Sequence, residues 1–136
     1  MISRTHRYLL IMSLCGIPAV GAVASEPLAL WHGGQRAEAI AEWERRAVTG
    51  DADAALLLAY VLKSGVGVTA DPQRAHSWYL SAARDGLVEA QYQLALMYEL
   101  GVGVDRDIDE ATYWYQRASR QSCPTEDTIG YRLGIR

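Results

Sequence analysis

Three aspartates at alternate positions are the first residues in this sequence whose spacing could do chemistry. Asp105, Asp107 and Asp109 have the spacing with which a calcium-binding loop begins. Such a loop also needs a glycine at its sixth position and a bidentate glutamate at its twelfth, where Glu110 and Gln116 stand. We therefore interpret the aspartates as an acidic helix start, where negative charge is favourable, and we predict no metal site.

Soft metal ligands and catalytic motifs are also scarce. Beyond residue 24 the candidate ligands are His32, His76 and Cys123, which lie far apart and lack the spacing of a zinc site. The glycines within 65–68 have neither the lysine nor the preceding strand of a phosphate loop, and no Gly-x-Ser-x-Gly motif occurs. We therefore expect no catalytic residues, no cofactor and no enzyme activity. Cys123 is either an inert small residue or the site of an intermolecular disulfide.

The first 24 residues have the three-part pattern of a secretory signal peptide. Arg4 and Arg7 supply the positive start, residues 8–17 an apolar run, and Ala22-Val23-Ala24 a cleavage site of small residues. The apolar run is short for a transmembrane helix, although a retained membrane anchor is the alternative. We expect cleavage after Ala24, a periplasmic or secreted protein, and no stable membrane insertion after cleavage.

The chain that would remain after cleavage is acidic. The whole sequence carries 13 Lys and Arg against 16 Asp and Glu, a net charge of −3, and cleavage would remove two arginines and no acid. Binding to nucleic acid requires a basic stripe, so nucleic acid is a poor candidate partner, as is an anionic membrane surface. One cysteine would remain, which excludes an internal disulfide. We expect a monomer that is stabilised by packing.

The sequence repeats itself at an offset of 36 residues. Gly65-Val66-Gly67-Val68 recurs as 101–104, and Trp78-Tyr79 recurs as Trp114-Tyr115. Further matched pairs are Gly50 and Gly86, Ala54 and Ala90, Leu58 and Leu94, Ala59 and Ala95, Asp71 and Asp107, Ala75 and Ala111, and Ala82 and Ala118. A period in this range indicates a solenoid of stacked helical units.

Each unit predicts two helices separated by a glycine turn. Apolar residues at helical spacing predict a first-type helix over about 53–64 and a second-type helix over about 72–85. Asp71 suits an N-cap, and Pro72 suits the first helical position. A further second-type helix is predicted over about 35–49, where Arg46 replaces an alanine of the later copies and suits a terminal repeat with a solvated side.

These residues carry a family resemblance. Leu94-Ala95-x-x-Tyr98 followed by Ala111-x-x-x-Tyr115 is similar to the tetratricopeptide pattern. The 36-residue period, the Gly-x-Gly-Val turn and the Ala-x-x-Trp-Tyr-x-x-Ala helix more specifically resemble the Sel-one-like repeat. The resemblance implies an all-α fold, an α–α superhelical solenoid, that acts as a scaffold or adaptor for protein partners in the bacterial cell envelope. A specific inhibitor or immunity-type protein is the alternative, and a cell-envelope hydrolase is less favoured.

The repeats divide the chain into segments. We predict a signal peptide at 1–24, a lead-in at 25–34, a partial repeat at 35–50, repeat 1 at 51–86, repeat 2 at 87–122 and a C-terminal capping segment at 123–136. The tryptophans Trp43, Trp78 and Trp114 occupy repeat-core positions. Trp31 lies outside the pattern and is therefore a candidate for an exposed ring.

The first-type helices carry a second stripe of residues, which the resemblance would place on the concave surface of the solenoid. We predict a groove for a protein partner, with an apolar floor and charged ends, formed by Asp53, Leu56, Tyr60, Lys63, Glu89, Tyr92, Leu96 and Glu99. Alternatively, Leu56 and Tyr60 pack against neighbouring helices.

Overall fold

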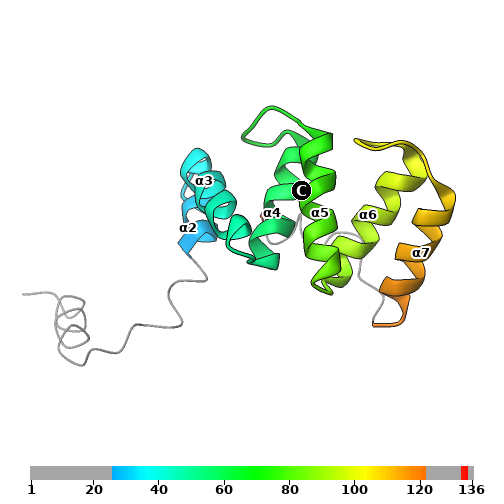
Figure 1. Cartoon of the computed structure of the whole chain (residues 1–136). Coiled ribbons are helices and arrows are strands. Elements are labelled where there is room, and N and C mark those ends of the chain that lie inside the picture. Colours follow the sequence, from blue (N-terminus) through cyan, green and yellow to red (C-terminus); the bar gives the residue numbers. More distant parts are fainter. Residues whose placement is uncertain (1–25, 122–132, 135–136) are drawn as a thin grey trace, which may run out of the picture.

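The computed structural model describes residues 26–121 and 133–134, and within them it contains six helices and no strands. In chain order the helices are α2 (Glu26–His32), α3 (Arg36–Val48), α4 (Ala52–Ser64), α5 (Pro72–Arg84), α6 (Val88–Leu100) and α7 (Ile108–Ser119). Each helix packs against the next one along the chain, so that the helices form a row of α–α hairpins from α2 to α7 (Figure 1). This arrangement is the predicted solenoid, and the predicted bounds of α3, α4 and α5 agree with it to within one residue. The signal peptide and Cys123 lie outside the described residues.

Aspartates begin three of these helices, and the sequence predicts two of these starts, at Asp71 and Asp107. The Asp51 carboxylate accepts a hydrogen bond from the backbone N–H of Ala54 at 3.0 Å, and Asp71 accepts one from Arg74 at 3.1 Å. Asp107 accepts two backbone bonds, from Asp109 and Glu110. These bonds satisfy amides at the helix N-termini that have no partner inside the helix. The Asp107 carboxylate is thus used as an N-cap, as the interpretation of the three aspartates expects.

The glycine turns end the first-type helices. Gly65 and Gly101 adopt left-handed conformations, with φ of +71° and +69°, directly after α4 and α6. Few residues other than glycine adopt this conformation readily, which explains why the turn begins with glycine in both repeats. Backbone hydrogen bonds then join the start of the next helix to the end of the previous one. The N–H groups of Asp71 and Asp107 donate to the carbonyls of Leu62 and Tyr98, respectively.

Alanines and aromatic rings share the core between the helices. Ala39, Ala75 and Ala90 are completely buried, which lets neighbouring helices approach closely, and Trp43 and Tyr79 fill the larger spaces. Two of the three predicted core tryptophans are buried, since Trp43 is 2% and Trp114 is 5% exposed. The prediction for Trp78 is only partly right, because its ring is half-buried at the edge of the core.

Trp31 contradicts the expectation of an exposed ring. Residues 26–32 of the predicted lead-in form α2, and Trp31 on this helix is only 3% exposed. Its ring lies against Trp43 with a centroid distance of 5.3 Å, and its indole N–H donates to the carbonyl of Leu133 at 2.9 Å. The helix was not evident from the 36-residue pattern because the turn after it, Gly33–Gln35, is shorter than the turns of the two full repeats.

The C-terminal end of the described chain returns to the first helix. Leu133 is 2% exposed and belongs to the same core cluster as Trp31 and Trp43, and Gly134 lies beside the His32 ring. In Figure 1, α2 and α7 stand at opposite ends of the row. These two residues of the predicted 123–136 cap therefore lie against α2, the first described helix, and not on α7.

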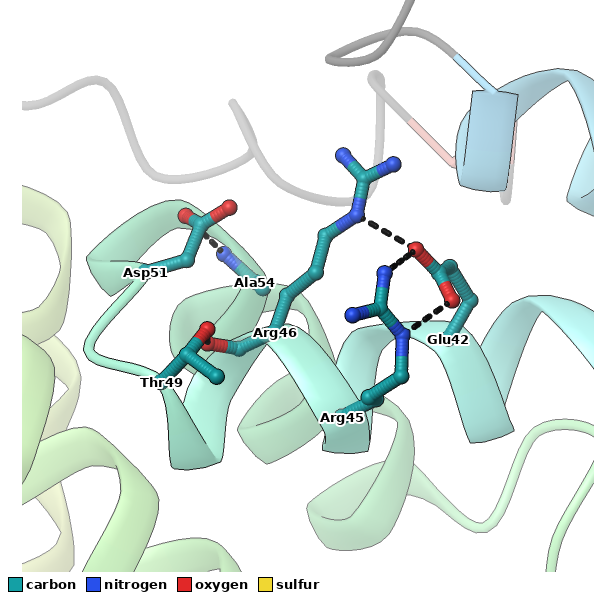
Figure 2. Close-up of polar contacts among 6 residues, drawn as sticks. All are labelled: Glu42, Arg45, Arg46, Thr49, Asp51 and Ala54. Carbon is teal, nitrogen blue, oxygen red and sulfur yellow. Dashed lines mark hydrogen bonds and ion pairs between the residues drawn. The ribbon is translucent and has the colours of Figure 1, made fainter.

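Arg46 is not solvated, contrary to the interpretation of this residue as part of an exposed terminal face. Its side chain is only 11% exposed, and its Nε donates to Glu42 at 2.7 Å. Glu42 also pairs with Arg45, whose two donors bind both carboxylate oxygens (Figure 2). Hydrogen bonds from Arg45 and then Arg46 lower the pKa of the Glu42 carboxyl to about 2. Arg46 lines a small hollow together with Pro27 and Leu28 of α2, so this side of α3 faces α2 and not bulk solvent.

Candidate functional site

The predicted groove residues on α4 differ in how much of each side chain is accessible to a partner. Leu56 is completely buried, so it belongs to the core and cannot serve as a surface anchor, as the packing alternative expects. Tyr60 is half-buried and packs on the edge of the same core. Asp53 is exposed beside a hollow of about 160 Å³ between α2, α3 and α4. Of the predicted apolar anchors on α4, only Tyr60 therefore keeps a surface for a partner.

Lys63 is held by its own molecule and is not a free charge at the groove. Its Nζ donates to Gln93 Oε1 of α6 at 2.6 Å and lies 5.9 Å from the centroid of the Tyr79 ring. Burial lowers the pKa of the Lys63 ammonium, because the charged form loses solvent. This hydrogen bond joins α4 to α6 and places the two predicted stripes side by side.

The α6 half of the stripe stays closer to the surface. Glu89, Tyr92 and Leu96 are half-buried, and Glu99 is exposed. Asp53 lies at the hollow between α2, α3 and α4 and is left out; we use the name α4–α6 face for the other accessible residues of the predicted groove together with Gln93, which are Tyr60, Lys63, Glu89, Tyr92, Gln93, Leu96 and Glu99. The face combines two tyrosines and a leucine with two carboxylates, so it offers apolar contact area and negative charge together.

Tyr115 of α7 extends this face, although the predicted groove did not include it. Its ring lies edge-on to Tyr92 with a centroid distance of 5.5 Å and an interplanar angle of 62°. Its hydroxyl donates to Glu99 Oε2 at 2.7 Å. Burial and then the Glu99 carboxylate raise the pKa of the Tyr115 phenol above its usual value. We call these residues the Tyr92–Glu99–Tyr115 cluster.

The repeat itself contained a signal for Tyr115. At the 36-residue offset it matches Tyr79, which the pattern places on the core side of its helix. Tyr79 is indeed completely buried, and its hydroxyl has no hydrogen-bond partner among the described residues. Tyr115 is only half-buried. Equal positions in the repeats therefore differ in exposure, and this difference depends on which elements lie next to each copy.

The described residues do not assemble a metal site. No group of three or more His, Cys, Asp or Glu side chains within residues 26–121 and 133–134 could hold a metal ion. His76 is half-buried, with its ring edge-on to Tyr98 at a centroid distance of 5.2 Å. A hollow of about 570 Å³ at the loop edge is lined by 68–74 and Gly103, without histidine or cysteine. No helix in the described ranges is long and apolar enough to cross a membrane.

Paired helices, capped by aspartate and separated by glycine turns, define a helical-repeat protein of the solenoid class. The family model of the Sel1 repeat matches residues 52–87 and 88–123, which together make up more than half of the chain. This chain therefore belongs to the Sel1 repeat family. Repeats of this family indicate a scaffold for protein–protein interaction.

Two solved structures share this fold. A Sel1 repeat protein from Oxalobacter formigenes is 28% identical with a TM-score of 0.67, over 80% of this chain and 44% of that protein. The protein c5321, a protective antigen present in uropathogenic Escherichia coli strains, displays an SLR fold and is 26% identical with a TM-score of 0.69. That match covers 76% of this chain and 24% of c5321.

A curated relative from a eukaryote matches a shorter part of the chain. Chitin synthase regulatory factor 3 of Schizosaccharomyces pombe is 37% identical over 54 residues, which are 40% of this chain and 6% of that protein. This chain thus spans less than half the length of each of these three relatives.

Proposed function

We propose that this chain is an exported bacterial scaffold that binds a segment of a protein partner on its α4–α6 face, and that it acts by binding and not by catalysis. The observation that carries the proposal is the position of Tyr92, Leu96 and Tyr115. Each of these side chains is only half-buried on neighbouring helices, and part of each stays accessible, although Tyr115 also packs against the edge of the core. Tyrosines are efficient anchors at interfaces because they bury a large area at a small cost in conformational entropy.

Charge supports a partner segment with basic residues. Glu89 and Glu99 lie on the face, and the chain as a whole has a net charge of −3. The one lysine of the face, Lys63, is already bound to Gln93. Complementary charge at an exposed rim contributes to partner choice and to the association rate more than to affinity.

The proposed location is the periplasm or the exterior of the cell. The Arg4 and Arg7 start, the apolar run and the Ala22-Val23-Ala24 site support export by a cleaved signal peptide. Sequencing the N-terminus of protein recovered from a periplasmic fraction tests this part of the proposal. A first residue of Ser25 would support it, and a chain that still begins at Met1 would contradict it.

Site-specific photocrosslinking tests the interaction surface. A photoreactive phenylalanine analogue replaces Leu96 on the α4–α6 face. In the control protein it replaces Tyr113, which is 50% exposed and whose side chain points to a different side of α7 from Tyr115. In cells that make the full chain, we expect a partner protein to be crosslinked through position 96 and not through position 113. Equal crosslinking at both positions, or crosslinking through 113 alone, would place binding elsewhere.

Affinity for the captured partner provides the quantitative test. The double change Tyr60→Ala and Tyr92→Ala should weaken binding by at least about 2 kcal/mol if both rings are interface hot spots. The double change Thr112→Ala and Tyr113→Ala, on exposed positions of α7, is the matched control. Unchanged affinity together with a large loss of stability would show that Tyr60 and Tyr92 serve the core.

A further inference from the structure

The two repeats carry opposite charges beside the same tyrosine position. At the 36-residue offset, Lys63 matches Glu99 and Tyr79 matches Tyr115. In the first repeat, Lys63 Nζ lies 5.9 Å from the Tyr79 ring centroid. A cation within about 6 Å of an aromatic ring is attracted by the electron density of the ring face. The first repeat therefore supplies its own cation to its tyrosine.

The second repeat has the same aromatic position but a carboxylate in place of the lysine. Glu99 accepts the Tyr115 hydroxyl bond at 2.7 Å, and Tyr92, which replaces Leu56 of the first repeat, adds a second ring at 5.5 Å from the Tyr115 ring. Within the described part of the chain, cations lie over the rings of Trp31, Tyr79 and Trp114, and over neither ring of this cluster.

We propose that the Tyr92–Glu99–Tyr115 cluster binds a lysine or arginine side chain of the partner segment. This inference rests on the proposed function and assigns the chemistry of one partner residue. The ring faces attract the cation, and the Glu99 carboxylate, one oxygen of which accepts the Tyr115 bond, supplies a negative charge beside them. A phenol that donates its proton to a carboxylate also carries more electron density on its ring, which strengthens the attraction. The cation occupies the place that Lys63 holds in the first repeat.

Short model compounds test the site without knowledge of the partner. The full chain is titrated with Nα-acetyl-arginine methylamide and with its neutral counterpart Nα-acetyl-citrulline methylamide, and NMR follows the tyrosine ring signals. We expect the signals of Tyr92 and Tyr115 to shift saturably with the arginine compound, with an apparent Kd about two- to fivefold lower than for citrulline, the factor of one exposed cation–π contact. Equal shifts with both compounds, or shifts at other tyrosines only, would overturn the proposal.

Three variants separate a charge-specific site from general attraction to an acidic protein. Glu99→Gln should reduce the preference for arginine over citrulline, because the carboxylate charge is lost while both rings remain. Glu99→Lys restores the residue of the first repeat and should abolish binding, because the new ammonium occupies the site itself. Asp105→Asn removes one negative charge from an exposed residue of the α6–α7 loop and should leave the preference unchanged. An equal loss in Asp105→Asn and Glu99→Gln would overturn the proposal.

Folding controls keep the result interpretable. Tyr92→Leu places the residue of the first repeat, Leu56, at the matching position of the second, so it provides a variant that removes one ring while preserving apolar volume. Its circular dichroism melt should resemble that of the wild type, while its arginine affinity falls. An unchanged affinity for arginine in a folded Tyr92→Leu protein would contradict a site that includes this ring.

The two proposals can fail separately. If a partner crosslinks through position 96 but binds Glu99→Lys and wild type equally, the α4–α6 face is an interface and the cation site is wrong. If arginine shifts the cluster while no partner crosslinks through position 96, the cation site stands and the proposed scaffold function at this face fails.

Discussion

Trp31 and Trp43 illustrate how a single residue type takes its role from its neighbours. The two rings lie 5.3 Å apart between α2 and α3, and both are almost completely buried. Trp78 occupies the same position of its repeat as Trp114, yet it is half-buried where Trp114 is 5% exposed. The energetic weight of each ring therefore follows from its exposed area and not from its place in the repeat.

The first prediction compares two of these tryptophans. Trp43→Ala should lower the free energy of unfolding by about 3–5 kcal/mol, the usual range for emptying a buried aromatic site. Trp78→Ala should cost clearly less, because part of its ring already contacts solvent. Denaturant melts of the two variants measure the difference. Equal costs would mean that Trp78 is as well packed as Trp43.

A second prediction at the scale of the residue concerns acid. Arg45 and Arg46 lower the pKa of the Glu42 carboxyl from 4.5 to about 2 (Figure 2). A group with a lowered pKa in the folded state stabilises the fold above its unfolded pKa, and this stabilisation is lost as the pH falls through the folded value. Glu42→Gln should thus be less stable than wild type at neutral pH, and the gap should close between about pH 4.5 and pH 2.

Thermal melts across that pH range provide the measurement for Glu42. Glu38→Gln, at an exposed glutamate in the first turn of the same helix, is the control. If the difference between wild type and Glu42→Gln does not change with pH in this range, the ion pairs with Arg45 and Arg46 do not stabilise the fold in solution.

At the scale of the element, the glycine turns connect the helices and also touch the next repeat. Gly103 follows α6 with φ of +71°, and its Cα lies so close to the backbone of Pro72 that an added Cβ would overlap the Pro72 carbonyl oxygen. Pro72 is the first residue of α5. The second turn of the repeat array is therefore packed directly against the start of the preceding second-type helix.

The third prediction separates backbone strain from this close approach. Gly86→Ala, at a glycine with φ of +96° and open space around it, should cost about 1–2 kcal/mol, because an L-residue is strained at positive φ. Gly103→Ala should cost more than Gly86→Ala, because the new methyl group also forces the turn away from Pro72. Urea melts measure both. Equal losses of stability in the two variants would show that the turn moves away from Pro72 at no additional cost in free energy.

At the scale of the whole molecule, the contact between the chain ends departs from a simple repeat array. In such arrays each unit contacts only its neighbours, so stability is a sum of local terms. Here Leu133 and Trp31 are 102 residues apart and share a buried hydrogen bond and a common core cluster. This contact couples the first helix to the last described residues, and it should make the repeats unfold together.

The fourth prediction tests this coupling. Leu133→Ala should lower the free energy of unfolding by about 2–5 kcal/mol, as expected for a fully buried leucine. Val48→Ala removes an apolar side chain that is 71% exposed and should change stability by less than about 0.5 kcal/mol. Tryptophan fluorescence follows the melts, since Trp31 and Trp43 report on this end of the molecule. A Leu133→Ala protein as stable as wild type would show that the end contact is not formed in solution.

Much of the fold followed from the sequence, because its determinants are local. The spacing of Ala75, Trp78 and Tyr79 predicted α5, Asp71 and Pro72 marked its start, and the structure agrees with these bounds to within one residue. Helix periodicity and capping depend on residues within about two turns of one another, so a single sequence contains the information. The 36-residue offset then predicted the solenoid, because similar units must stack in similar ways.

Exposure was decided by the tertiary structure. The pattern left Leu56 as either a groove anchor or a packing residue and made Trp31, outside the repeats, a candidate for an exposed ring, and both residues are buried. Tyr115 matches the completely buried Tyr79 at the 36-residue offset, yet it is only half-buried and contacts Tyr92 and Glu99. Periodicity identifies which side of a helix turns inward, but the solvent exposure of one side chain depends on elements far away in sequence. Leu133 covers Trp31 across 102 residues, and no local pattern contains that contact.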